Sequence, residues 1–205
     1  MRLQPVPAAQ RSSRAWLCCA AVMAATACEA VNAAPVTYEI DAQRSQPSFE
    51  VMHKGAPRWK GQFQFARGTM TIDREAQWGR VALDIDMSSV DFGGTVMNNF
   101  VKGPLMFEAQ RFPMARFEGQ LSEPIDGMPT KVEGLLTLHG VTKPLKLKLH
   151  HVRCAPEEGS RRERCVANAS GQFLRDEFGV DFGRALGLEM AVMLKIHAEA
   201  LAVQP

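Results

Sequence analysis

The sequence predicts an all-β fold in which one antiparallel sheet is closed, or nearly closed, on itself. From Pro35 onward, apolar and polar residues alternate with a period of two, which places them on opposite faces of a strand. Turn-forming residues, such as Pro-Ile-Asp-Gly at 124–127, separate the alternating runs. No linker divides the chain and no heptad pattern or internal repeat occurs, so these observations predict one tall barrel or sandwich.

Ten segments carry the alternation and are the predicted strands. They are 36–41, 47–54, 60–65, 68–73, 79–87, 114–122, 130–139, 142–152, 165–173 and 188–201. Segments 142–152 and 188–201 are unusually long, and at about 3.3 Å per residue the second spans roughly 45 Å. Segments 91–111 and 175–187 lose the alternation, and we expect them to be loops that carry a turn or two of helix.

The first 33 residues have the plan of a signal peptide. Three arginines precede an uncharged stretch over 15–27, and small residues lead up to Ala33. This stretch is shorter than the about 20 apolar residues that a membrane-spanning helix needs. We therefore expect a signal peptide over 1–33, a mature domain over 34–205, export to the periplasm and no stable membrane span.

Composition and charge exclude several classes of protein. The chain has 205 residues, of which 46% are hydrophobic and 22% charged, so it can bury one core and is not a disordered chain. Its 24 Lys and Arg residues nearly balance 22 Asp and Glu residues, and the small excess comes from the predicted leader. A neutral mature chain has no long-range field that attracts phosphate groups, so we expect no nucleic-acid partner.

Two cysteines remain after the leader. Of the five in the chain, only Cys154 and Cys165 follow Ala33, and they flank a polar loop between two strands that we expect to be adjacent. In an exported protein such a pair most simply forms a disulfide that closes the hairpin. A redox-active pair would have the tighter Cys-x-x-Cys spacing.

No set of residues has the spacing of a catalytic or metal site. The five histidines lie on different predicted strands without a chelating spacing. Asp84 and Asp86 share one face of a strand, but no perturbing cluster lies beside them. We therefore expect no catalytic residue, no metal site and no enzymatic activity.

Six stretches follow one another in the order of a known family. They are YEIDAQRSQPSFEVMHKG, GQFQFARGTMTID, VALDIDMSSVDFG, RFPMARFEG, LLTLHGVTKPLKLKL and GQFLRDEFGV. With them, the chain over 36–201 resembles the YceI-like family of exported polyisoprenoid-binding proteins. The resemblance implies an extended antiparallel β-barrel, lipocalin-like in plan, whose apolar tunnel holds a long isoprenoid or similar lipid.

The resemblance and the apolar alternation together predict a lipid-binding function. We expect the protein to hold a polyisoprenoid, a quinone-like lipid or a fatty lipid for transport, storage or scavenging, with no cofactor besides the bound lipid. A membrane that donates or accepts the lipid, and a dimer, are compatible with this role. The alternatives are the capture of apolar antibiotics or other amphiphiles in the same cavity, and a solid barrel that acts through protein contacts.

The predicted tunnel residues are the inward-facing apolar residues of the strands and an apolar segment that follows SSVDFG. In this segment family members often carry a polar Asp-x-His-Leu-basic-Ser run, which is absent here, so we expect an apolar lid instead. The lid candidates are Phe100, Leu105, Met106 and Phe107. The strand candidates are Phe49, Val51, Phe63, Phe65, Met70, Ile72, Leu83, Ile85, Phe117, Leu136, Leu138, Leu147, Met190, Val192 and Leu194.

Overall fold

The computed structural model describes residues 34–204 except 54–55, 65 and 126–127, and within these residues the chain forms eleven strands and one α-helix. The signal peptide predicted over 1–33 lies outside the described residues. The strands are β1 (Val36–Ile40), β2 (Gln46–His53), β3 (Ala56–Phe63), β4 (Ala66–Asp73), β5 (Trp78–Asp86), β6 (Val90–Asp91), β7 (Met114–Ile125), β8 (Met128–Leu138), β9 (Val141–Pro156), β10 (Glu163–Leu174) and β11 (Leu188–Ala202).

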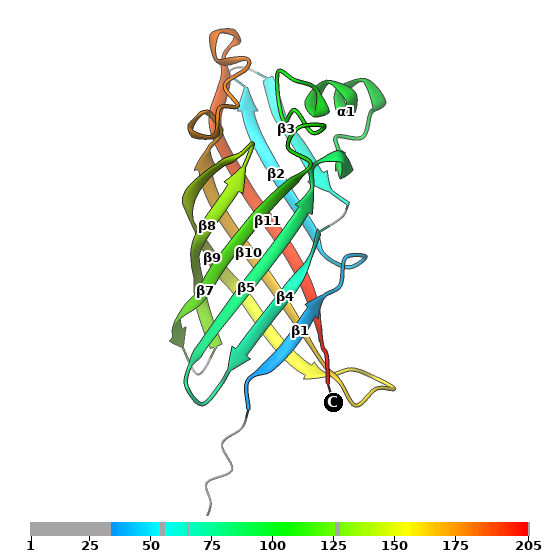
Figure 1. Cartoon of the computed structure of the whole chain (residues 1–205), viewed down its shortest axis with the longest axis vertical. Coiled ribbons are helices and arrows are strands. Elements are labelled where there is room, and N and C mark those ends of the chain that lie inside the picture. Colours follow the sequence, from blue (N-terminus) through cyan, green and yellow to red (C-terminus); the bar gives the residue numbers. More distant parts are fainter. Residues whose placement is uncertain (1–33, 54–55, 65, 126–127, 205) are drawn as a thin grey trace, which may run out of the picture. The chain divides into compact units, whose positions relative to one another are not determined.

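The strands form an antiparallel barrel, which confirms the predicted fold class (Figure 1). The order β1-β4-β5-β7-β8-β9-β10-β11 closes into a ring of eight strands because β11 also pairs with β1. β1 pairs with only the last part of β11, and β2 pairs with the first half of that strand. β3 and β6 continue the sheet from β2. All ten predicted strands are present with bounds shifted by a few residues, and only the two-residue β6 has no predicted counterpart.

Short helices gather at one end of the barrel, which we call the helical end. Helix α1 (Thr95–Lys102) and the 3-10 helices η1 (Met87–Ser89), η2 (Arg175–Phe178) and η3 (Arg184–Leu186) interrupt the strands. Figure 1 places α1 and the segment around residue 180 at the same end. The segments 91–111 and 175–187 are thus loops with short helical turns, as the loss of alternation predicts.

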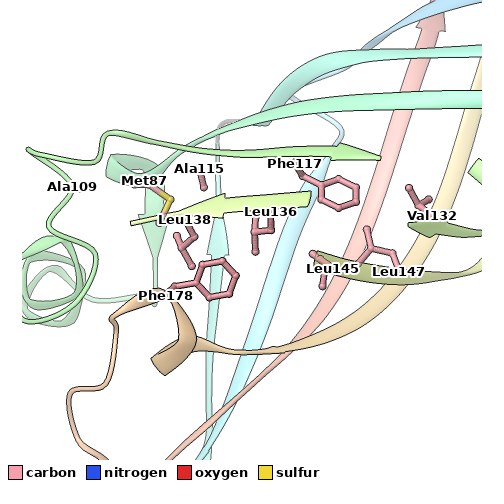
Figure 2. Close-up of a cluster of buried hydrophobic side chains, with 10 residues drawn as sticks. All are labelled: Met87, Ala109, Ala115, Phe117, Val132, Leu136, Leu138, Leu145, Leu147 and Phe178. Atoms are coloured by element: carbon pink, nitrogen blue, oxygen red, sulfur yellow. The ribbon is translucent and has the colours of Figure 1, made fainter. Parts of the chain in front are cut away.

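The alternation of the sequence becomes the inside and the outside of the barrel. On β9, Leu145 and Leu147 are buried whereas Lys146 and Lys148 are exposed. Side chains from β7, β8 and β9 meet in one interior cluster (Figure 2). Burial of such a cluster stabilises the fold by about 25 cal/mol for each Å² of apolar surface removed from water.

A serine side chain completes the backbone hydrogen bonding of the wall at the point where β11 stops pairing with β2 and begins to pair with β1. β11 pairs with β2 through His197 and with β1 from Ala200 onward. Between them, the Ser45 hydroxyl accepts a hydrogen bond from the Glu199 amide at 3.0 Å and donates one to the Glu199 carbonyl at 3.2 Å. The Asp41 amide also donates to that carbonyl at 2.8 Å, so the buried backbone polar groups of Glu199 stay paired.

The predicted disulfide is present. Cys154 on β9 and Cys165 on β10 are directly opposite each other in the strand register and are bonded through their sulfur atoms. They lie near the end of the barrel opposite the helices, which we call the disulfide end. The bond closes the β9–β10 hairpin as a covalent staple.

Replacing both cysteines with alanine should lower the free energy of unfolding by about 2–3 kcal/mol, because the unfolded chain loses the constraint of a short closed loop. Urea unfolding of the wild type and of the double variant measures the difference. Reduced wild type is the matched control and should coincide with the double variant. Equal stability of the oxidised wild type and the double variant would contradict a stabilising role of the disulfide.

Candidate binding cavity

An apolar cavity of about 130 Å³ lies inside the barrel. It extends from Val101 and Met106 beneath the helical end to Ile40 and Ala198 toward the disulfide end. No polar atom of the described residues is exposed to this cavity, although Ser45, Arg175 and His197 contribute apolar atoms to its wall. A cavity of such a size with apolar walls excludes water and accepts apolar guests.

Most of the predicted tunnel residues line this cavity. The strand candidates in the lining are Phe49, Val51, Phe63, Leu83, Ile85, Phe117, Leu136, Leu138, Leu147, Val192 and Leu194. Two lid candidates, Met106 and Phe107, line it as well.

Some predicted residues lie elsewhere. Met70 and Ile72 face inward but pack in the cluster around Tyr38 near the disulfide end, beyond the cavity. Leu105 is 60% exposed in the turn after α1, because that segment has no strand periodicity that would orient it inward. The prediction that these three residues line the tunnel is therefore corrected.

Two further candidates, Phe100 and Met190, fall outside the cavity lining. Phe100 packs edge-to-face on Phe182 at 5.1 Å between ring centroids, so it supports the loops at the helical end. Met190 is half-buried between Leu188 and Val192, where the register of β11 with β2 shifts. Phe65 lies outside the described residues.

Sequence reasoning missed several lining residues for two different reasons. Phe173 and Ile196 lie on predicted strands with the correct periodicity, so the signal was available. Phe92 and Val180 lie beyond the ends of strands, where no periodicity shows that the chain folds back over the interior.

Aromatic rings form much of the wall near the helical end. The Phe49 ring lies 5.4 Å from the ring of Phe63 and 5.4 Å from that of Phe92, measured between centroids. Phe107 joins them at 6.0 Å from Phe63. Tilted and edge-on contacts of this kind are favourable, so the four rings make a continuous apolar wall.

Asn98 attaches α1 to the barrel. Its side-chain amide donates to an Asp91 carboxylate oxygen at 3.0 Å, and its carbonyl oxygen accepts from the Phe92 amide at 2.7 Å. The bond from Asn98, together with one that the Gly93 amide donates to the same carboxylate, holds the pKa of the Asp91 carboxyl below its usual range. Through this attachment Val101, which is 1% exposed, is held against the cavity.

Arg175 organises the second loop over the helical end. Its side chain is buried, and its guanidinium donates to the carbonyls of Val180 at 2.7 Å, Phe182 at 2.8 Å and Glu189 at 3.1 Å. Burial lowers the pKa of Arg175, and the nearby carboxylate of Asp176 opposes this shift. Two carbonyls of the loop and one from the start of β11 thus converge on one side chain.

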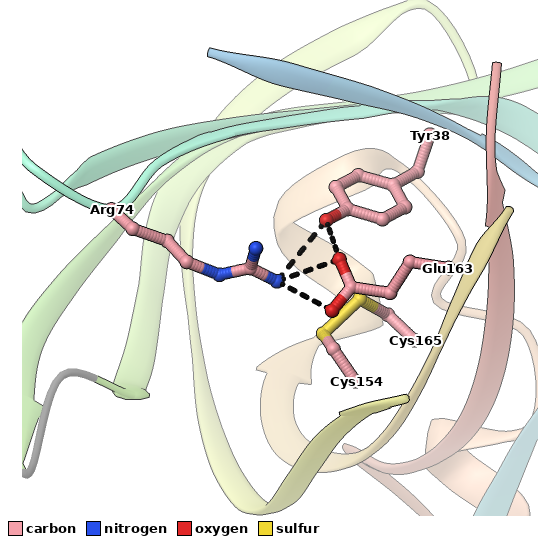
Figure 3. Close-up of a disulfide and its surroundings, with 5 residues drawn as sticks. All are labelled: Tyr38, Arg74, Cys154, Glu163 and Cys165. Atoms are coloured by element: carbon pink, nitrogen blue, oxygen red, sulfur yellow. Dashed lines mark hydrogen bonds and ion pairs between the residues drawn. A yellow bond between two sulfur atoms is a disulfide. The ribbon is translucent and has the colours of Figure 1, made fainter. Parts of the chain in front are cut away.

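A hydrogen-bonded trio closes the disulfide end (Figure 3). The Tyr38 hydroxyl donates to Glu163 Oε2 at 2.6 Å and accepts from Arg74 Nη2 at 3.2 Å, and the same Arg74 nitrogen donates to Glu163 Oε2 at 2.8 Å. Burial, followed by the hydrogen bond to Glu163, raises the pKa of Tyr38 to about 12. The phenol is therefore held in its protonated form.

Substituting Arg175 with methionine should destabilise the protein by about 3 kcal/mol, because three carbonyls, one of them fully buried, lose a charged donor. The matched control is Arg184→Met, which removes an exposed partner of Asp176 and should cost at most about 1 kcal/mol. Urea unfolding compares the two variants. Equally small losses would show that Arg175 does not hold the loop.

The raised pKa of Tyr38 predicts a loss of stability in alkali. The folded protein binds the phenolic proton more tightly than the unfolded chain, so the resulting stabilisation is complete below pH 10 and disappears as the pH rises toward 12. The loss should approach about 2–3 kcal/mol in the wild type and be absent from Tyr38→Phe. Unfolding free energies between pH 9 and 12 measure it, and parallel curves for the two proteins would contradict it.

Within the described part of the chain, no helix is long and apolar enough to cross a membrane. Over the same residues, no group of three or more His, Cys, Asp or Glu side chains is placed to hold a metal ion.

Known proteins share both the sequence pattern and the barrel. The YceI-like domain model matches residues 38–200. A UPF0312 protein of Vibrio cholerae is 23% identical over 175 residues, which covers 84% of this chain and 89% of the relative. Protein YceI of Escherichia coli O6:H1 is 30% identical over 120 residues, which covers 57% of this chain and 62% of that protein.

Solved structures have the same fold. BcnA of Burkholderia cenocepacia aligns with a TM-score of 0.64 at 23% identity, covering 78% of this chain and 98% of that chain. A polyisoprenoid-binding domain from Saccharophagus degradans aligns with a TM-score of 0.58 at 20% identity, covering 82% and 99%. Because the domain model spans nearly the whole barrel, the chain belongs to the YceI-like family.

Proposed function

We propose that the protein is an exported lipid-binding protein that holds a long apolar chain inside its barrel. The observation that carries this proposal is the cavity within the barrel, to which the described residues expose no polar atom. Membership of the YceI-like family supports it, as does the similarity to a domain described as polyisoprenoid-binding. The occupant we favour is a polyisoprenoid, a quinone-like lipid or a fatty lipid.

The hydrophobic effect alone is large enough to drive this binding. Each methylene that leaves water gains about 0.8 kcal/mol, so a ten-carbon segment gains roughly 8 kcal/mol before the cost of ordering it. The wall needs no catalytic group and no headgroup contact for such affinity. We therefore propose a role in binding, with the polar head of the lipid outside the cavity.

Export and cellular role are further parts of the proposal. The signal-peptide pattern over 1–33 and a disulfide between β9 and β10 both fit an oxidising compartment such as the periplasm. There the protein would transport, store or scavenge its lipid, with a membrane as donor or acceptor.

Native mass spectrometry of protein purified without detergent tests the proposal, with a bound long-chain species as the expected result. Leu136→Trp should lower the lipid-bound fraction at least about tenfold, because the larger side chain takes space in the cavity that Leu136 lines. The control is Leu135→Trp on the same strand, since Leu135 is 53% exposed and does not line the cavity.

Two outcomes would contradict the proposal. Wild type that carries no lipid, and gains none when mixed with polyisoprenol or fatty-acid vesicles, would favour the solid barrel. Equal loss of lipid from both tryptophan variants would place the lipid outside the cavity. Recovery of apolar antibiotics in preference to membrane lipids would favour the capture of amphiphiles.

A further inference from the structure

We propose that the packed cluster around Tyr38, which Ile40 joins to the cavity, is the floor of the cavity and sets the longest apolar chain that the barrel can hold. This inference rests on the proposed lipid-binding function and adds a limit on ligand length to it. It follows from the level at which the cavity stops on each strand, from the packing of Tyr38 and from the anchoring of its hydroxyl.

The cavity stops within one step of the alternation on β1 and β11, which are neighbours in the wall. On β1, Ile40 lines the cavity, but Tyr38, the next inward residue toward the disulfide end, does not. On β11, Ala198 lines it, but the next inward residue, Ala200, belongs to the Tyr38 cluster. On both strands, one inward residue lines the cavity, and the next, about 7 Å further along the strand, belongs to the Tyr38 cluster.

Other strands show the same boundary. On β5, Leu83 lines the cavity whereas Val81, one step closer to the disulfide end, does not. On β9, Leu147 lines the cavity whereas Leu149, one step closer to the disulfide end, does not. Several strands thus change, toward the disulfide end, from residues that line the cavity to residues that do not, as a floor across the barrel requires.

Tyr38 is the side chain best placed to form this floor. It is 0% exposed and is among the largest fully buried side chains of the described chain. The other buried members of its cluster, Ala200, Ala202 and Cys165, are small, and Val36, Ile40, Met70 and Ile72 pack against the cluster. Tyr38 is therefore the largest buried side chain of the cluster.

The ring is anchored where it lies. Its hydroxyl bonds to Glu163 and Arg74, which lie at the disulfide end on β10 and just after β4 (Figure 3). Moving the ring aside for a longer ligand would break both bonds of the Tyr38 hydroxyl, which costs free energy unless the hydroxyl finds new partners. The floor is thus rigid, unlike one made of a flexible methionine.

A rigid floor produces a distinct dependence of affinity on chain length. Each methylene that fits above Tyr38 should tighten binding about fourfold, since it leaves water for an apolar wall. A methylene added beyond the limit stays in water and should add nothing. A plot of the logarithm of Kd against chain length should therefore fall steadily and then become flat at a break.

The experiment measures Kd for straight-chain alcohols from about 8 to about 18 carbons, by displacement of N-phenyl-1-naphthylamine from the full chain. Wild type and Tyr38→Phe should share one break, because both keep the ring. Tyr38→Ala should move the break to longer chains by at least about two methylenes, because the next inward position lies about 7 Å further along β1.

Ala198→Leu is the second variant and keeps Tyr38 intact. Its larger side chain enters the cavity just above the floor, so the break should move to shorter chains while short alcohols bind as in the wild type. This variant tests the floor even where Tyr38→Ala fails to give a cooperative thermal transition.

The outcomes separate the floor from the proposed function. Wild type that binds with a break, which then moves in opposite directions in Tyr38→Ala and Ala198→Leu, supports the floor. Binding without a break, a break that stays in place in a folded Tyr38→Ala, or a uniform loss at all lengths in Ala198→Leu overturns the floor and leaves the lipid-binding proposal standing. Wild type that binds no alcohol of any length overturns both.

Discussion

The closure of the sheet through β11 is the constraint on which the other features of the barrel depend. This strand pairs with β10 along one edge, and with β2 and then β1 along the other. Because the ring has no free edge at that point, every second residue of each strand must face a common interior. The exchange of neighbours leaves Glu199 without a strand partner on the edge that faces β1 and β2, and the Ser45 hydroxyl and the Asp41 amide bond to its backbone there. A single wall therefore encloses the apolar space.

The two ends of this space are closed by different physical means. At the helical end, Arg175 gathers three carbonyls, and Asn98 ties α1 to the strand before it. At the disulfide end, a packed ring is anchored by polar groups, so the apolar face of Tyr38 points inward and its hydroxyl joins an ionic network. The side chains of Arg175, Asn98 and Tyr38 thus form their hydrogen bonds within the protein, and the described residues expose no polar atom to the cavity. Selection among ligands would then come from length and shape rather than from charge.

Much of the fold could be predicted from the sequence, because alternation with a period of two is a local property of the backbone. The same property indicates the face of a side chain and nothing about its height in the barrel. Met70 and Leu83 both obey the alternation, yet only Leu83 lines the cavity. In the aperiodic segments even the face is undefined, so Leu105 and Met106 appear equivalent in the sequence although one is exposed and the other is buried.

The sequence by itself determined the strands, the inward-facing residues and the pairing of Cys154 with Cys165, since each depends on near neighbours or on the only two cysteines that follow residue 33. The tertiary structure decided where the interior is empty and where it is filled. That division depends on the combined volume of side chains from strands far apart in the chain, such as Tyr38 against Cys165 and Ala200. No local sequence pattern gives this combined volume, because residues far apart in the chain reach the same level only through the strand register of the closed barrel.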